Sequence, residues 1–85
     1  MDSRALYESE AKRGRSDALY NLGLAYSTGQ GVTQDYVVAH KWFNLAALRG
    51  SDIAKNWRNQ IAAEMNAGQL AQAQKLAREW LSIFK

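Results

Sequence analysis

The sequence predicts an all-α fold, in which antiparallel helical hairpins stack as a short α-solenoid of about five helices. Three observations lead to this prediction. The chain has no proline and few β-branched residues, its apolar positions recur three and four residues apart, and short groups of glycine and polar residues separate the periodic segments. Because short connections keep each helix beside the one before it, we expect successive antiparallel hairpins.

The first three predicted helices span about residues 3–13, 16–28 and 35–49. Only a weak apolar stripe marks the first, through Leu6, Tyr7 and Ala11. The next two carry fuller stripes, which consist of Ala18, Leu19, Leu22, Ala25 and Tyr26, and of Ala39, Trp42, Phe43, Ala46 and Ala47. Gly14, Gly29 and Gly50 follow the three segments, at positions where a left-handed residue ends a helix without steric cost.

The last two predicted helices span about residues 52–65 and 67–83. In the fourth helix four apolar residues recur at i, i+4 spacing, namely Ile53, Trp57, Ile61 and Met65. The fifth presents Leu70, Ala73, Ala77, Trp80, Leu81 and Phe84. The predicted helix caps are Ser16 or Asp17, Ser51 or Asp52, and a capping box formed by Asn66 and Gln69.

The net charge of +3 is spread along the chain, and only Lys12, Arg13 and Arg15 form a basic cluster. We interpret this cluster as a solvated helix end, where cations complement the macrodipole, with phosphate contact as the alternative. The chain has no run of about 20 apolar residues and no apolar signal core at its charged N-terminus. We therefore expect no membrane span and a cytoplasmic protein.

Gly29 and Gly31 raise the question of a nucleotide-binding loop, because G-x-G-x-x-G motifs approach phosphate groups closely. Such a motif follows a strand and has a third glycine. Here a helical pattern precedes the glycines, and Gln34 stands at the third position. We interpret the segment as the connector of a helical hairpin.

The chain offers few residues for catalysis or metal binding. It has no Cys and a single histidine, His40, and no Ser or carboxylate arrangement points to that histidine. Glu8 and Glu10 are two residues apart and so face different ways on a helix. We expect His40 to be structural, and we predict no catalytic residue, no cofactor, no metal site and no enzymatic activity.

The chain resembles itself at a spacing of 36 residues, since residues 6–14 can be laid over residues 42–50. Residues 11–50 resemble the Sel1-like repeat, a relative of the tetratricopeptide repeat. The matching residues are Ala18, Leu22, Gly23, Tyr26, Gly29, Gly31, Val32, Asp35, Ala39, Trp42, Phe43, Ala46, Ala47 and Gly50. Residues 52–83 look similar to the divergent helix pair that often closes short bacterial arrays of this kind.

The resemblance predicts a single domain over residues 1–85. A half unit (1–14) precedes one full repeat (15–50), and a divergent capping helix pair (51–85) follows. Gly23 and Ala18 are expected to let the third helix approach the second closely while Trp42 and Phe43 fill the space around them. Stable arrays usually need about three units. We therefore expect either a piece of a longer array or a chain that associates with itself.

The resemblance also implies that the first helix of each pair lines a concave surface that holds a partner segment. The outward candidates on the two such helices are Asp17, Tyr20, Asn21, Leu24, Ser27, Asn56 and Gln60. We predict a non-enzymatic interaction module that binds a protein or peptide there. The alternatives are a structural unit that forms homo-oligomers through its open ends and, last, a weak basic nucleic-acid binder.

Overall fold

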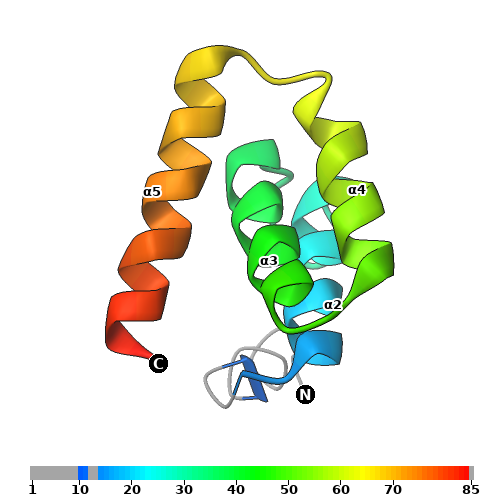
Figure 1. Ribbon diagram of the computed structural model, residues 1–85. Helices are drawn as coiled ribbons and strands as arrows, with labels where there is room; N and C mark the ends of the chain where they lie inside the picture. The colour runs from blue at the N-terminus through cyan, green and yellow to red at the C-terminus, as the bar shows by residue number, and fades with distance from the viewer. Residues whose placement is uncertain (1–9, 12–13, 85) are drawn as a thin grey trace.

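The computed structural model describes residues 10–11 and 14–84. Over these residues it is all helical, with α2 (Ser16–Thr28), α3 (Tyr36–Leu48), α4 (Asp52–Ala62) and α5 (Ala67–Ile83) (Figure 1). The predicted all-α fold is thereby confirmed. The predicted first helix and the half unit of residues 1–14 lie outside the described residues, except Glu10, Ala11 and Gly14. Glu10 and Ala11 are helical.

α3 is the central helix of the fold. It packs against α2, α4 and α5, whereas α2 and α4 touch each other along a narrower contact. Figure 1 shows α4 and α5 on opposite sides of α3, joined through residues 63–66 and otherwise apart. α5 is therefore attached to the rest of the described chain mainly through α3.

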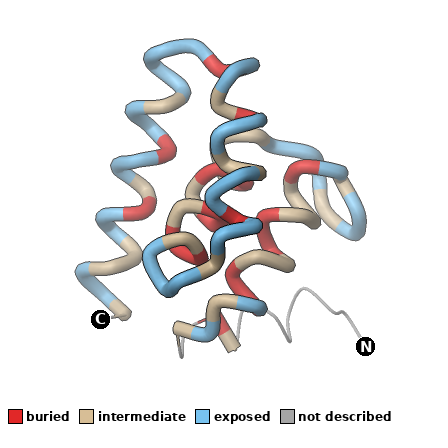
Figure 2. Tube along the Cα trace, turned by 45° about the vertical axis from the view of Figure 1, so that its right-hand side comes forward, coloured by how far each residue is buried: buried red, intermediate tan, exposed pale blue. Residues whose placement is uncertain are grey.

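The core lies where α2, α4 and α5 meet α3. Its largest completely buried side chains are Leu19, Leu22, Phe43 and Leu45. Figure 2 shows the buried positions on the inner sides of the helices and the exposed positions on their outer sides. α2, α4 and α5 thus each bury one face, as their apolar periodicity predicts, whereas the central α3 buries residues on several sides.

Gly23 permits the close approach of α2 and α3. A Cβ atom built at this position would overlap Cδ1 of Phe43 and lie 2.9 Å from Cγ of the same ring. Phe43 therefore occupies the space that any larger residue at position 23 would need, as we expected.

Side-chain caps begin three of the four described helices. Asp35 accepts hydrogen bonds from the amides of Val37 and Val38 at 2.9 and 3.2 Å, and Ser51 accepts one from Ala54 at 3.2 Å. The capping box is also present, with Asn66 and Gln69 bonded reciprocally at 2.8 and 2.9 Å. The predictions of Ser51 and of the capping box are confirmed.

Two details of the predicted helices are wrong. α2 begins after Arg15, which has no side-chain capping bond, so neither Ser16 nor Asp17 is the cap residue. Asp17 instead accepts from the amide of Ala18, its direct neighbour. α4 ends at Ala62 instead of Met65, because the amides of Glu64 and Met65 bond to carbonyls three residues back and tighten the last turn.

The connector between α2 and α3 is a hydrogen-bonded turn. Gly29 has a left-handed φ of 79°, and its amide donates to the carbonyl of Ala25 at 2.8 Å. Farther along, the side-chain amide of Gln34 donates to the Ser27 carbonyl at 2.8 Å, and the backbone amide of Asp35 donates to the Tyr26 carbonyl at 2.9 Å. The segment folds back over the end of α2, which agrees with a hairpin connector.

Candidate functional site

The contact between α2 and α4 brings together two aromatic side chains from different helices. The ring of Tyr20 on α2 lies 6.0 Å from the Phe43 ring, and the ring of Trp57 on α4 lies 6.3 Å from it in a stacked arrangement. Phe43 is completely buried, whereas Tyr20 and Trp57 are half-buried. Both rings therefore have one side on the core and another at the surface.

Amide and apolar side chains flank these rings. We call the surface formed by Tyr20, Asn21, Leu24, Ile53, Asn56, Trp57 and Gln60 the α2/α4 seam. Asn56 and Gln60 are exposed, while Asn21 and Leu24 are half-buried. Within residues 10–11 and 14–84, the side-chain amides of Asn21, Asn56 and Gln60 make no hydrogen bond, so their donors and acceptors are free to bind another molecule.

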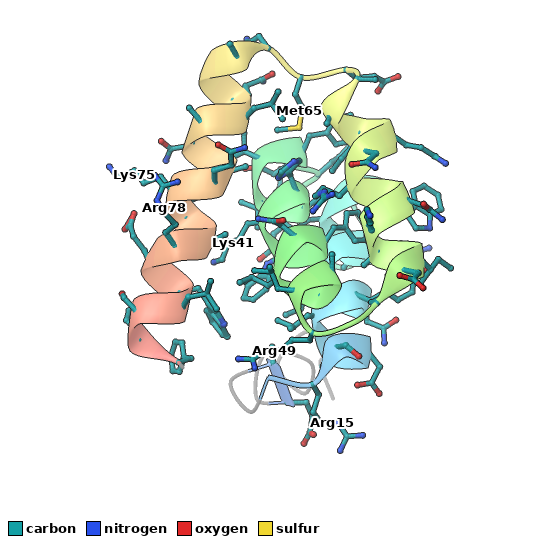
Figure 3. The ribbon with its side chains drawn as sticks, viewed as in Figure 1. Arg15, Lys41, Arg49, Met65, Lys75 and Arg78 are labelled. Carbon is teal, nitrogen blue, oxygen red and sulfur yellow. The ribbon has the colours of Figure 1, made fainter. Side chains whose placement is uncertain are left out.

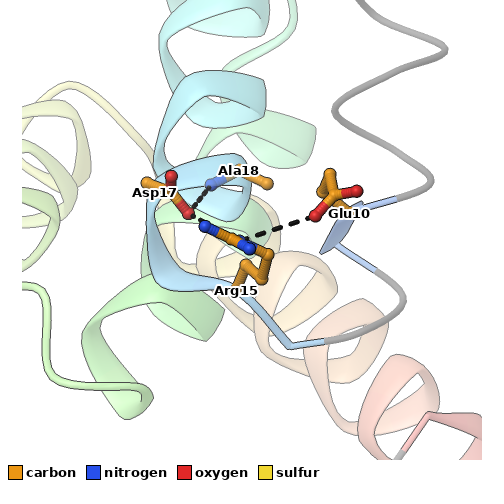
Figure 4. Close-up of polar contacts among 4 residues, drawn as sticks. All are labelled: Glu10, Arg15, Asp17 and Ala18. Carbon is orange, nitrogen blue, oxygen red and sulfur yellow. Dashed lines mark hydrogen bonds and ion pairs between the residues drawn. The ribbon is translucent and has the colours of Figure 1, made fainter.

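Two of the predicted outward residues, Asp17 and Ser27, are not part of the α2/α4 seam. Asp17 is exposed at the start of α2, where one carboxylate oxygen lies 3.5 Å from Nε of Arg15 (Figure 4). Ser27 is buried, with 9% of its surface exposed, and its hydroxyl donates to the Leu24 carbonyl at 3.0 Å. The expected outward position of Ser27 is therefore wrong, because the connector covers the end of α2.

Ile53 and Trp57 belong to the seam although the sequence pattern assigned them to the core. Ile61 and Met65 are buried, Trp57 is half-buried, and Ile53 has 53% of its surface exposed. On a helix with 3.6 residues per turn, each step of four residues turns the stripe by about 40°. Over three steps the stripe winds out of the core, and Ala54 is buried in place of Ile53. This drift is visible in the sequence, but the packing of α4 on α3 decides which end of the stripe leaves the core.

The seven seam residues carry no charged group, but acidic residues border them. On α4 the exposed Asp52 and Glu64 lie four residues from Asn56 and Gln60. Arg58 points toward α3, where its guanidinium donates to Oδ1 of Asn44 at 2.9 Å. The carboxylate of Asp17 on α2 is adjacent to the Arg15 guanidinium, which also lies 3.5 Å from Glu10 (Figure 4).

His40 lies on the core side of α3. Only 5% of its surface is exposed, and its Nδ1 atom is buried without a hydrogen-bond partner. Burial lowers the pKa of His40 below its ordinary value of 6.5, and the positive charge of Arg58 lowers it further. The imidazole is therefore neutral at pH 7, as a structural histidine would be.

The described residues contain neither a group of three or more metal-ligating side chains nor a helix long and apolar enough to cross a membrane. The chemistry that the seam residues present at the surface is that of aromatic rings, amides and aliphatic groups. Such groups form non-covalent contacts with another macromolecule.

Comparisons with known proteins found two matches of interest. Residues 16–51, which contain α2, the connector and α3, match the Sel1 repeat. The whole chain is similar to a protective antigen present in uropathogenic Escherichia coli strains, whose crystal structure displays an SLR fold. The TM-score is 0.89 at 30% sequence identity, and the match covers 95% of this chain and 18% of the antigen chain. No curated protein matches the chain.

Proposed function

Since this chain is a Sel1-like repeat protein, we propose that it is a non-enzymatic interaction module that holds a segment of a partner protein on the α2/α4 seam. Repeats of this family generally mediate protein–protein interaction. The observation that carries the proposal is the pair of half-buried rings, Tyr20 and Trp57, on one buried Phe43 ring. The chain spans 18% of the length of the similar antigen, so the partner is proposed for this domain alone.

The chemistry of the seam suits a polypeptide partner. Aromatic side chains supply a large contact area at a low entropic cost, and they are enriched at the centres of protein interfaces. Asn56 and Gln60 each carry a donor and an acceptor, which is the pair of groups that every peptide unit of an extended segment also presents. The helix fixes the backbone positions from which these side chains extend, so the backbone need not be ordered on association.

The proposal is tested by removing the seam amides and measuring partner recovery. The double variant Asn56→Ala/Gln60→Ala changes two exposed side chains and leaves Tyr20 and Trp57 on the core. The matched control is Gln72→Ala/Gln74→Ala, which removes two exposed amides from α5. We expect affinity purification with quantitative mass spectrometry to show that partners recovered by the wild type and the control are lost by the seam variant.

Circular dichroism and a urea titration establish that both variants are folded. Equal recovery of every partner by a folded seam variant would show that the seam is not the binding surface.

A further inference from the structure

We infer that the partner segment held on the α2/α4 seam is basic, with lysine or arginine side chains that meet the acidic residues bordering the seam. This inference rests on the proposed function and adds the chemical class of the partner. It comes from the positions of charged residues along α2 and α4, because helical spacing places the acidic ones beside the seam and the basic ones on other faces.

Three exposed acidic residues border the seam. At the two ends of α4, Asp52 lies four residues before Asn56, and Glu64 lies four residues after Gln60. At the start of α2, Asp17 likewise lies four residues before a seam residue. Because residues three and four apart are neighbours on the surface of a helix, these carboxylates lie along the edges of the surface on which the partner segment would rest.

The basic residues near the same two helices lie on other faces. Lys55 and Arg58 are the basic residues of α4, and neither is three or four residues from a seam residue. The Arg58 guanidinium donates to Asn44 of α3. α2 contains no basic residue, and Arg15, which precedes it, lies 3.5 Å from the Asp17 carboxylate. Asp52 and Glu64 are therefore the two border residues most available to a partner.

The carboxylates of Asp52 and Glu64 have no partner within the described part of the chain, where neither takes part in a hydrogen bond or an ion pair. A segment that covers them reduces their hydration, and a positive charge beside them offsets this cost. An acidic segment would be repelled. Figure 3 shows Lys75 and Arg78 on α5, across α3 from α4, so their positive charge does not take this role.

A lysine or arginine side chain matches both the apolar and the acidic parts of this surface. Its methylene stem covers apolar surface while its charged head reaches a carboxylate. Ile53, which is more than half exposed, directly follows Asp52, and the half-buried Trp57 lies four residues after Ile53. The face of an indole ring also attracts a cation. An aliphatic or an acidic side chain would match one part at most.

The experiment selects peptides from a phage-displayed library of random linear sequences on the immobilised full chain. We expect the enriched sequences to be rich in Lys and Arg. The whole chain has a net charge of +3, so non-specific attraction would enrich Asp and Glu instead. For the synthetic forms, calorimetry should show a Kd that weakens about fivefold or more between about 50 and 500 mM NaCl. Enrichment of uncharged or acidic sequences, or a Kd that changes by less than about twofold, would overturn the inference.

Charge reversal at Glu64 locates the attraction. The charge of Asp52 in the first turn of α4 also favours the helix, so the variant is made at Glu64. We expect Glu64→Lys to bind about fivefold more weakly at about 50 mM NaCl. The matched control Glu79→Lys makes the same change in net charge at an exposed position of α5 and should keep the Kd within about twofold. Equal Kd values for the two variants, both folded by circular dichroism, contradict the inference.

The outcome also separates this inference from the proposed function. Uncharged or acidic peptides that bind the wild type and are lost by Asn56→Ala/Gln60→Ala would leave the seam as the binding surface and overturn the inference alone. Peptides that bind that double variant as well as the wild type, or a selection that enriches no peptide, would count against both.

Discussion

At the scale of single residues, the contact of Gly23 with Phe43 sets how closely α2 and α3 pack. The Phe43 ring is completely buried and carries Tyr20 on one helix and Trp57 on another. The absence of a side chain at position 23 is therefore connected to the surface proposed to bind a partner, because it determines where the Phe43 ring lies.

Replacing Gly23 with alanine should destabilise the protein. Alanine raises helix propensity by about 1 kcal/mol, but the added methyl group would overlap the Phe43 ring, and overpacking of a core costs about 1 to 3 kcal/mol. We expect a net loss in the free energy of unfolding, measured by urea titration.

The control for this prediction is Gly68→Ala in the first turn of α5, where a Cβ would meet only Oδ1 of Asn66 at 3.4 Å. This variant should be as stable as the wild type or up to about 1 kcal/mol more stable. A Gly23→Ala variant that matches Gly68→Ala would refute the close approach of the two helices.

His40 predicts a dependence of stability on pH. It is the single histidine of the chain, and burial lowers its pKa in the folded state below 6.5. The unfolded chain, with an ordinary histidine pKa, therefore takes up a proton at a higher pH than the folded chain does. Stability should be complete above about pH 6.5 and should fall below it with a slope of up to about 1.4 kcal/mol per pH unit.

Urea titrations between about pH 5.5 and 7 isolate this effect, because unperturbed carboxyl groups titrate near pH 4. The variant His40→Gln cannot take up the proton and should show a flatter profile, whatever its absolute stability. The same slope in both proteins would show that another group is responsible.

At the scale of helices, α4 differs from α2 in how it meets α3. At the 36-residue spacing Arg58 corresponds to Leu22, which is completely buried, and Asn59 corresponds to Gly23. Arg58 is half-buried and bonds to Asn44, and Asn59 is exposed. α4 buries Ala54, which corresponds to the buried Ala18, and Ile61, which corresponds to the half-buried Ala25. Ile53 and Trp57 correspond to Asp17 and Asn21, which are not buried either, and so they lie at the seam.

α5 depends on a small set of contacts with α3. Ala73 and Ala77 are buried against the core, and the Trp80 ring meets the Trp42 ring edge-on at 4.8 Å. The Lys41 ammonium group lies 4.2 Å from the Trp42 ring and 5.5 Å from the Trp80 ring. These contacts hold the C-terminal end of α5 in place.

Trp80→Ala should loosen α5 more than the rest of the fold. The truncation removes the contact with Trp42, and because Trp80 is only half-buried we expect a cost at or below about 3 kcal/mol. Hydrogen exchange with mass spectrometry should show faster exchange in residues 67–83 and little change in α2.

Glu79→Ala, an exposed neighbour on the same helix, is the control and should leave protection of α5 unchanged. Uniformly faster exchange in all helices of Trp80→Ala would mean that α5 unfolds only together with the whole domain.

At the scale of the whole molecule, the exposed positions of the last two helices are mostly polar, with Ile53 and Ile83 as large apolar exceptions. Exposed positions there include Lys55, Asn59, Gln72, Gln74 and Lys75. A terminal repeat unit needs such a surface, because no further helix pair covers it. This composition is what a cap over residues 51–85 would need; the cap and the alternative of self-association stay predictions.

The sequence by itself determined the helical class, the repeat and much of the local structure. The predicted bounds of α2 and α5 are those of the structure, and the glycine connector and the capping box form as expected. These features depend on groups close together in the chain, such as Asn66 and Gln69, or on backbone conformations that glycine adopts easily. Five seam residues, Tyr20, Asn21, Leu24, Asn56 and Gln60, were also among the outward candidates of the two helices, and their role in binding stays a prediction.

Only the tertiary structure decided which part of each stripe is buried. Periodicity shows which residues share a face, but the rotation of a helix about its own axis is set by the helix it packs on. α4 buries Ala54 and Ile61, which leaves Ile53 exposed, and Trp57 stacks on the Phe43 ring, near which Tyr20 also lies. The burial of Ser27 likewise depends on the path of the connector. These side chains are brought together by contacts between separate helices, which the spacing along one helix cannot specify.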